Sequence, residues 1–315
     1  MPLVEVTNLT KQYTPGGVKA VDNVSFEVQA GEIFSLLGPN GAGKTTTLAM
    51  LSSLLKPTSG EAVVNGYAVT RQPMEVRRSI GVVPQELAVY EDLSARENLR
   101  FWGEMQGRHG PDLQREIEEK LALMELTDRA TDRVKTFSGG MKRRLNLAIG
   151  LLGNPPLVML DEPTVAIDPQ SRRYILDWVK KMNREGVSVL YTTHYMEEAQ
   201  ELSHRIGIID HGKLIAVGTL AELTELVGQK ETLTLRLYQE AGGERLAQAV
   251  TDLAGIHQAS ARNGDVVINV DSAEEALPRV LARAADLDLS IRTIEIQEPN
   301  LEAVFLHLTG RALRD

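Results

Sequence analysis

Apolar and polar residues alternate in two segments at the start of the chain. Val4 and Val6 alternate with polar neighbours, and segment 24–28, Val-Ser-Phe-Glu-Val, repeats the pattern after a turn-forming Thr-Pro-Gly-Gly at 14–17. A period of two residues is typical of a strand with one buried face. The glycine-containing turn marks a break between the two strands. These positions predict an antiparallel β element.

Short, nearly continuous apolar runs follow, and segments of helical spacing separate them. The runs lie at 33–37, 80–83, 157–160, 187–191 and 206–209. Such runs are typical of strands buried on both faces. After the first run, Leu48, Leu51 and Leu55 have helical spacing, and Pro57 ends that helix. Strands that alternate with helices predict an α/β fold, with a mainly parallel sheet covered by helices on both faces.

The pattern also indicates subdivisions. Residues 89–154 are mostly helical in pattern and long for a simple crossover, which predicts an inserted helical subdomain. A boundary near Gly228 would divide the chain into domains 1–228 and 229–315. The second part reads as strand, helix, strand, strand, helix, strand, helix, and is expected to be a small α+β domain. Its two expected turns are at 242–243 and 263–264.

Composition narrows the class of protein. The 34 Lys and Arg against 43 Asp and Glu give a net charge of −9, which argues against broad binding to nucleic acid or anionic lipid. The 315 residues include no cysteine, which excludes thiol nucleophiles and Cys-based zinc sites and fits a reducing compartment. No secretory signal is visible, and no apolar run approaches the roughly 18 residues of a spanning helix. A soluble, cytoplasmic chain is expected.

The strongest chemical signal lies at 38–45, where Gly-Pro-Asn-Gly-Ala-Gly-Lys-Thr fits the phosphate-loop pattern between a predicted strand and helix. Glycines let backbone N–H groups converge on phosphate oxygens, and the helix N-terminus adds partial positive charge. Lys44 would reach the terminal phosphates of a nucleotide, and Thr45 would present its hydroxyl to Mg²⁺. An accidental match is expected roughly once in a hundred chains of this size. The candidate binding residues are Gly38, Pro39, Asn40, Gly41, Ala42, Gly43, Lys44, Thr45 and Thr46.

An acidic pair follows another predicted strand. Asp161 comes directly after the apolar run at 157–160 and would hold Mg²⁺, through water. Glu162 would point to the other side of the backbone, where it could polarise the attacking water. Either acid alone could simply cap a strand end. Together with the phosphate loop, the pair indicates an ATPase that takes ATP and Mg²⁺.

Segment 137–144, Phe-Ser-Gly-Gly-Met-Lys-Arg-Arg, lies some twenty residues before Asp161. Here the chain resembles the ATP-binding subunits of ABC transporters, whose signature motif is near LSGGQ. Ser138 could be only a helix N-cap, with the glycines bending the chain, but the position between the two nucleotide motifs favours the resemblance. The resemblance implies that Ser138, Gly139 and Gly140 bind the γ-phosphate of ATP held by a second subunit.

The resemblance implies further roles. Gln85, after the run at 80–83, is similar to the Q-loop glutamine, which senses Mg²⁺ and water and links to the membrane partner. His194 resembles the catalytic switch histidine that contacts the γ-phosphate. Tyr13 resembles the aromatic residue that stacks on adenine. Taken alone, Gln85 would more often be a surface polar residue and His194 a structural one, and the alternative for Tyr13 is an exposed aromatic residue in a turn.

One segment departs from the family pattern. Residues 165–168, the D-loop, read Val-Ala-Ile-Asp, with Ala166 where glycine is common. If this position needs a positive φ, alanine is strained there by about 1 kcal/mol or more. Asp168 before Pro169 is also a good N-cap for the next helix, so it is expected to be structural as well as part of the nucleotide site.

The resemblance implies a P-loop NTPase fold of the ABC type. This fold has a RecA-like parallel-sheet core, an antiparallel β subdomain and a helical subdomain, here followed by the α+β domain at 229–315. That domain is similar to the extension of daunorubicin-type exporter ATPases and would serve regulation or dimer contact.

The resemblance also implies partners. Two copies would form a head-to-tail homodimer with two ATP molecules at the interface, with no nucleic acid. A separate permease would hold the dimer at the cytoplasmic face of the cell membrane and export a drug-like or lipophilic substrate. Residues 87–100 are the candidate permease-facing surface, with ordinary helix packing as the alternative. The ATPase of a glycan or lipid exporter, and a soluble ABC-type ATPase outside transport, remain alternative functions.

Overall fold

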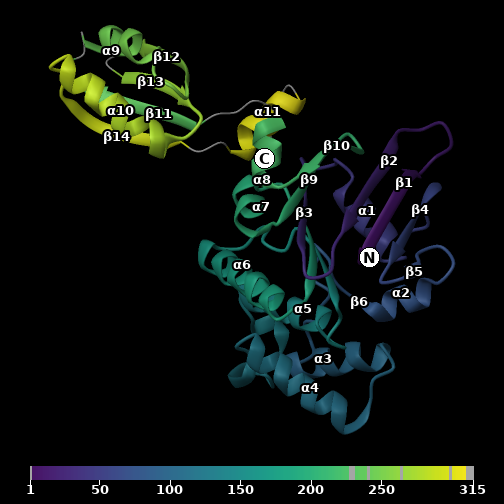
Figure 1. Cartoon of the computed structure of the whole chain (residues 1–315). Helices are drawn as coiled ribbons and strands as arrows, with labels where there is room; N and C mark the ends of the chain where they lie inside the picture. Colours follow the sequence, from purple (N-terminus) through teal and green to yellow (C-terminus); the bar gives the residue numbers. More distant parts are fainter. Residues whose placement is uncertain (1, 227–230, 240–241, 263–264, 298–299, 310–315) are drawn as a thin grey trace. The chain divides into compact units, whose positions relative to one another are not determined.

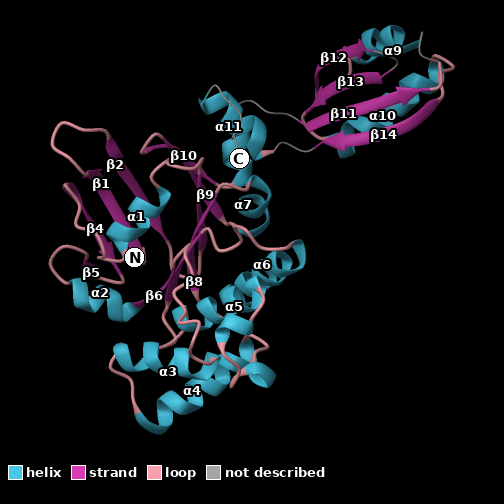
Figure 2. Ribbon diagram, turned by 180° about the vertical axis from the view of Figure 1, so that it is seen from behind, coloured by secondary structure: helices cyan, strands magenta, loops and turns pink. Residues whose placement is uncertain are grey.

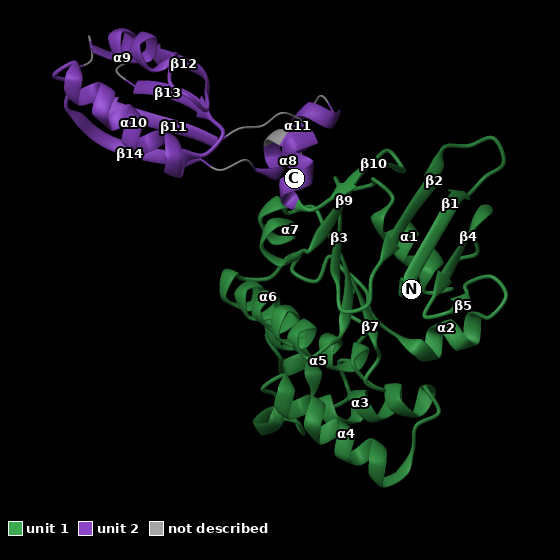
Figure 3. Ribbon diagram, in the orientation of Figure 1, with its two compact units in different colours: residues 1–219, 313–315 green, residues 220–312 purple. Residues whose placement is uncertain are grey.

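The computed structural model describes residues 2–226, 231–239, 242–262, 265–297 and 300–309. The chain divides into two compact units between Thr219 and Leu220 (Figure 3). Helix α8 (Leu220–Leu226) belongs to the second unit, where it packs against α11 (Leu301–Thr309). The boundary expected near Gly228 lies outside the described residues. The division between the units falls before α8, because this helix packs against α11, a segment much later in the chain.

The first unit is built around a six-stranded sheet (Figure 1). Its strands in spatial order are β10 (Lys213–Gly218), β9 (Arg205–Asp210), β3 (Ile33–Leu37), β8 (Ser188–Thr193), β7 (Leu157–Asp161) and β6 (Ile80–Val83). All are parallel except β10, which runs antiparallel to β9 at the edge. Each apolar run expected as a buried strand forms one, and the mainly parallel sheet is confirmed.

A second sheet in this unit is antiparallel, as the alternating positions predict. Its order is β2 (Lys19–Val28), β1 (Val4–Gln12), β4 (Ser59–Val64) and β5 (Tyr67–Ala68). The pairing of β1 with β2 is the expected one. Strands β4 and β5 are not predicted by the pattern, because β4 buries only Ala62 and Val64 and gives little alternation to detect.

Different kinds of element cover the two faces of the six-stranded sheet. On one face, Phe34 and Met159 lie in a cluster with residues of the antiparallel sheet, of α1 (Lys44–Leu51) and of α2 (Pro73–Ser79). The rings of Phe34 and Phe26 stack there with centroids 5.1 Å apart. The expectation that helices alone cover both faces is wrong for this face, which the antiparallel sheet covers together with α1 and α2. The antiparallel sheet shares the face with helices because its own apolar side needs a partner.

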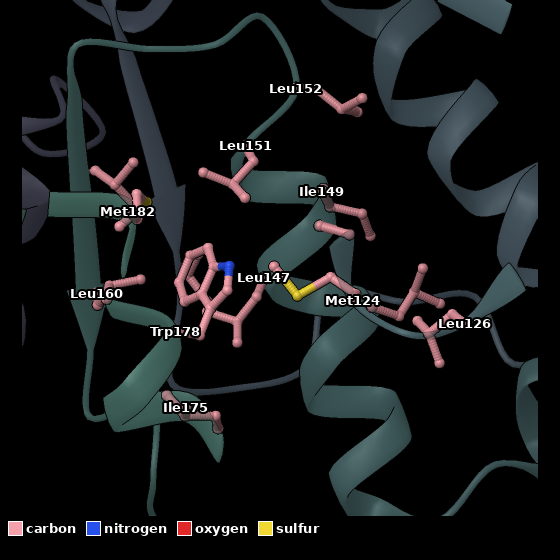
Figure 4. Close-up of a cluster of buried hydrophobic side chains, with 14 of the residues drawn as sticks. Met124, Leu126, Leu147, Ile149, Leu151, Leu152, Leu160, Ile175, Trp178 and Met182 are labelled. Carbon is pink, nitrogen blue, oxygen red and sulfur yellow. The ribbon is translucent and has the colours of Figure 1, made fainter. Parts of the chain in front are cut away.

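Helices cover the other face (Figure 2). They are α5 (Gly139–Gly150), α6 (Pro169–Arg184) and α7 (Met196–Leu202). Helices α3 (Ala95–Met105) and α4 (Gly110–Leu123) pack against α5, and 3₁₀ turns at Thr127–Arg129 and Val134–Thr136 follow α4. Figure 4 shows Trp178 of α6 near Leu147 of α5 and Met124 in the buried cluster. This packing fixes α5 and α6, whose N-caps are Ser138 and Asp168.

Helix α1 is shorter than the leucine spacing predicts. It ends at Leu51, and Ser53 has a left-handed backbone with φ 57°. The N–H groups of Leu54 and Leu55 both donate to the carbonyl of Ala49 at 2.9 Å, which closes the helix end. Leu55 still packs against the core, so its spacing reflects burial after a turn and not a continued helix.

The second unit contains a four-stranded antiparallel sheet in the order β12-β13-β11-β14. Its elements along the chain are β11 (Glu231–Leu237), α9 (Gly243–Val250), β12 (Ile256–Arg262), β13 (Asp265–Val270), α10 (Ala273–Asp286) and β14 (Ile291–Gln297), followed by α11. The predicted order of strands and helices is confirmed. Leu233, Leu235 and Ile268 form its core with α9 and α10. The turn expected at 263–264 lies outside the described residues. In the part of the chain that is described, no helix combines the length and apolar character of a membrane span.

Candidate nucleotide site

The phosphate loop connects β3 to α1 and approaches neighbouring backbone very closely. A Cβ at position 38 would lie 2.1 Å from the carbonyl oxygen of Ile209, so Gly38 is required by space. At Gly43, φ is 106° and a Cβ would lie 2.4 Å from the carbonyl oxygen of Ala20. Only glycine satisfies both conditions at this helix N-cap. Asn40 and Gly41 are exposed at the tip of the loop, whereas Ala42 is buried.

The side chain of Lys44 is buried against the phosphate loop, whose residues precede it in the chain. Its Nζ donates to the carbonyl oxygens of Gly38 at 2.6 Å and of Pro39 at 3.0 Å. The same Nζ lies 2.9 Å from Oε1 of Glu162. An ammonium group has three N–H donors, and these three oxygens account for all of them. Lys44 thus joins the phosphate loop directly to the acidic pair after β7.

Glu162 connects Lys44 to His194. Its Oε1 faces Lys44, and its Oε2 lies 3.0 Å from Nδ1 of His194. The backbone of Glu162 is left-handed with φ 43°, a conformation that costs a non-glycine residue about 1 kcal/mol or more. The two side-chain contacts compensate for that strain. They place the carboxylate between a cation and an imidazole, both buried.

Thr192 forms hydrogen bonds with both acidic residues, and its role is not predicted from the sequence. Its Oγ1 donates to Oδ1 of Asp161 at 2.6 Å and accepts from the backbone N–H of Glu162 at 3.0 Å. Asp161 and Thr192 are register partners on the parallel strands β7 and β8. The signal that could reveal this residue is a hydroxyl at the carboxyl end of the strand beside the acidic one.

Tyr13 lies just past β1 and reaches the first turn of α1. Its hydroxyl is 3.2 Å from Oγ1 of Thr46, and its residue is 61% exposed. The ammonium of Lys11 is 5.5 Å from the centroid of the ring. Thr45 is exposed beside Thr46. An accessible aromatic ring therefore borders the phosphate loop.

The segment that carries Gln85 is held by α5. The carbonyl of Pro84 accepts from Nη1 of Arg143 at 3.1 Å and from Nδ2 of Asn146 at 3.3 Å. Oδ1 of Asn146 also accepts from the N–H of Ala88 at 3.0 Å. Burial lowers the pKa of the Arg143 guanidinium below its usual value. Neither Arg143 nor Asn146 is predicted from the sequence, although both lie in the helix that the signature segment begins.

The signature segment lies beside the start of α6. Ser138 caps α5 by accepting from the N–H of Met141 at 3.2 Å, and both Ser138 and Gly139 are exposed. A Cβ on Gly140 would lie 2.1 Å from Oγ of Ser171 in the first turn of α6. The two helix starts are therefore in direct contact.

Asp168 is the N-cap of α6, as predicted. Its Oδ1 accepts from the N–H of Ser171 at 2.9 Å, and its Oδ2 accepts from the Ser171 hydroxyl at 2.6 Å. These hydrogen bonds lower the pKa of the Asp168 carboxyl. Ala166 has φ 58°, so the left-handed conformation considered for the D-loop is confirmed, together with its strain.

The candidate residues thus fall into separate groups. Lys44, Asp161, Glu162 and His194 are connected, through Thr192 where contact is not direct. Among the described residues, no hydrogen bond or ion pair joins Gln85, Ser138 or Asp168 to this group. The described residues also contain no set of three His, Cys, Asp or Glu side chains arranged to hold a metal ion.

Comparison with known proteins agrees with this arrangement. The family described as ABC transporter matches residues 21–165. The linearmycin resistance ATP-binding protein LnrL of Bacillus subtilis (strain 168) is 42% identical, with 99% of this chain and 100% of the relative covered. The daunorubicin/doxorubicin resistance ATP-binding protein DrrA of Streptomyces peucetius is 39% identical, with 99% and 94% covered.

Solved structures show the same fold. A dimeric ATP-binding cassette in a post-hydrolysis state, bound to ADP and Pi, is 30% identical, with a TM-score of 0.63. The similarity covers 69% of this chain and 98% of that one. The relatives instead match nearly the whole chain, including the second unit. The chain therefore belongs to the ATP-binding subunits of ABC transporters.

Proposed function

We propose that two copies of this chain bind Mg²⁺ and ATP between them and use hydrolysis to export a drug-like or lipophilic substrate through a separate permease. The observation that carries the proposal is the buried row of Lys44, Glu162 and His194 at the end of the phosphate loop. A cation, a carboxylate and an imidazole in contact supply a phosphate ligand, a candidate base and a group to orient it.

Lys44 would exchange partners when ATP binds. The γ-phosphate is a stronger acceptor for the ammonium than backbone carbonyls are, because both groups are charged. Loss of the Lys44 contact would leave Glu162 held by His194, with one oxygen able to accept a proton from the attacking water. His194 would orient that carboxylate and contact the γ-phosphate.

The donor set fits Mg²⁺. Magnesium prefers oxygen ligands, and it is usually bound by one or two carboxylates with substrate phosphates and waters. The hydroxyl of Thr45, the amide of Gln85 and a water held by Asp161 would supply such oxygens. The bound ion would neutralise charge that develops on the phosphates.

The second copy would complete each site. Ser138 and Gly139 are exposed at the start of α5, where backbone N–H groups and the helix dipole favour an anion. Gly140 beside them lies against Ser171 of α6, and no hydrogen bond or ion pair among the described residues joins Ser138 to Lys44, which supports their use on the ATP of a partner. Gly140 and Asp168 would hold this surface in shape, and Tyr13 would stack on adenine.

The permease would contact the exposed part of the segment after Gln85. Leu87 is 40% exposed and Tyr90 is 47% exposed, whereas Ala95, Asn98 and Leu99 are buried in the core. The candidate surface is therefore residues 87–100 without the buried side of α3, which packs internally. Attachment there would hold the chain at the cytoplasmic face of the membrane.

A single substitution tests the catalytic part of this proposal. Glu162→Gln keeps the shape of the side chain but removes the base, so phosphate release should fall roughly 100-fold or more. ATP should still bind, and the variant should accumulate as a dimer in analytical ultracentrifugation with Mg²⁺ and ATP. Phosphate release near the wild-type rate would remove Glu162 from the role of base.

The second unit has a separate proposed role in regulation or dimer contact. Its sheet and helices form a core of their own, which supports a module added to the ATPase unit. Deleting residues 220–315 should weaken ATP-dependent dimerisation or change the rate of transport while the ATPase unit still folds. Wild-type assembly and transport in the truncated chain would count against this role.

A further inference from the structure

A buried carboxylate lies behind His194. Glu198, in the first turn of α7, is 2% exposed. Its Oε2 accepts from the hydroxyl of Tyr191 and from Oγ1 of Thr193, both at 2.9 Å. Burial raises the pKa of the Tyr191 phenol well above its usual value, so the phenol stays protonated and able to donate. Glu198 therefore fixes the last residues of β8, next to His194.

The other oxygen of Glu198 faces a cation without forming a hydrogen bond. Oε1 is 3.6 Å from Nε of Arg172, and neither atom has a hydrogen-bond partner within the described residues. Charges taken out of water require compensation, and Arg172 is the cation that supplies it. At 3.6 Å the pair is longer than a hydrogen bond, so a small shift of Arg172 changes the contact.

Tyr195 connects both residues to His194. Its N–H donates to Oγ1 of Thr193 at 2.9 Å, and its ring centroid is 4.2 Å from that of His194. The guanidinium carbon of Arg172 is 4.4 Å from the centroid of the Tyr195 ring. The backbone on either side of His194 is therefore held by Glu198, and the ring beside it by Arg172.

Arg172 extends this network to the D-loop helix. Arg172 lies in the first turns of α6, and its backbone N–H donates to the backbone carbonyl of Asp168 at 2.9 Å. The strained Ala166 precedes that cap by two residues. A displacement at the start of α6 would move Arg172 against Glu198 and Tyr195.

We propose that Glu198 and Arg172 are positioning residues for His194, which couple the start of α6 to the imidazole that contacts Glu162. The inference rests on the proposed catalytic role of His194. Core stabilisation alone is the competing explanation. It predicts loss of stability without a specific link to His194.

A double-mutant cycle tests the link. Glu198→Gln keeps the volume but removes the charge that faces Arg172, and Arg172→Gln removes the cation from a partly exposed position. Each should lower single-turnover phosphate release at least fivefold, while the affinity for a fluorescent ATP analogue changes less than twofold. In a His194→Ala background, measured with radiolabelled ATP, each should have less than a twofold further effect.

Glu201→Gln is the matched control on the same helix. Its carboxylate pairs with Arg173 and Lys180 at the surface, so this variant should keep the wild-type rate. Equal rate losses in the wild-type and His194→Ala backgrounds would overturn the inference alone. A wild-type rate for His194→Ala would overturn the proposed role of His194 and this inference with it. If Glu198→Gln does not fold, the cycle that combines Arg172→Gln with His194→Ala is the test of the inference. Arg172→Lys should then have a rate of phosphate release between those of Arg172→Gln and the wild type.

Discussion

Lys44 and Glu162 form a buried ion pair, with 2.9 Å between Nζ and Oε1 and side chains only 3% and 5% exposed. The pair joins the phosphate loop to the end of β7, two segments more than a hundred residues apart in the chain. Breaking such a pair by removing one partner leaves an uncompensated buried charge. The residue expected to bind phosphate therefore also stabilises the fold of the site.

Lys44→Ala should lose both functions. ATP binding or hydrolysis should be lost with the point charge that holds the terminal phosphates. Thermal denaturation should show a loss of about 3 kcal/mol in unfolding free energy, because Glu162 stays buried without its cation. The double variant Lys44→Ala with Glu162→Gln should be more stable than Lys44→Ala alone. Unchanged affinity for a fluorescent ATP analogue in Lys44→Ala would mean that the phosphate loop has been assigned wrongly.

Ala166→Gly should stabilise the ATPase unit. The left-handed φ of 58° strains alanine but not glycine, so the gain should be up to about 1 kcal/mol in unfolding free energy. Urea denaturation gives the measurement. Ala122→Gly, on the exposed side of α4, is the control and should instead cost about 1 kcal/mol. A similar loss for both variants would show that position 166 does not retain its left-handed backbone.

Local patterns along the sequence account for much of this structure. The apolar runs predict the strands of the six-stranded sheet because a strand buried on both faces is made mostly of apolar residues. The phosphate loop is predictable because the spacing of Gly38, Gly43 and Lys44 is set by backbone approach and charge. Asp168 is predictable as an N-cap because capping depends on neighbours within three residues.

Other features depend on contacts between distant segments. Helix α8 joins the second unit through α11, which no local pattern indicates. Thr192, Arg143 and Asn146 act through partners on other elements, at sequence distances between 30 and 62 residues. Such partners become visible only when the sheet brings the strand ends together and α5 packs against the segment after β6.

Thr192→Val should remove the hydrogen bonds that the Thr192 hydroxyl forms with Asp161 and with the backbone of Glu162. Valine has nearly the same shape but cannot donate to Asp161, so the carboxylate loses a buried hydrogen bond worth about 1–3 kcal/mol. We expect a lower unfolding midpoint and a higher Mg²⁺ concentration for half-maximal ATPase activity. Thr192→Ser is the matched control and should stay close to the wild type. An identical Mg²⁺ dependence in the valine variant would contradict the support of the metal site by Thr192.

Asn146→Ala should loosen the segment that carries Gln85. The amide of Asn146 holds the carbonyl of Pro84 and the N–H of Ala88, and its loss should cost about 2 kcal/mol in unfolding free energy. Because Gln85 lies between those two attachments, its amide should also be placed less well for Mg²⁺, and half-maximal ATPase activity should require more of the ion.

Asn183→Ala separates this specific effect from a general loss of stability. Asn183 also makes two hydrogen bonds, to the carbonyls of Gly31 and Val187, but lies at the end of α6 away from the phosphate loop. It should lose stability in thermal denaturation yet keep the wild-type Mg²⁺ dependence. An equal shift in Mg²⁺ dependence for both variants would mean that the Asn146 effect reflects stability alone. A shift confined to Asn146→Ala would show that the signature helix positions Gln85, since Ser138 caps this helix and Asn146, eight residues later, holds the segment that carries Gln85.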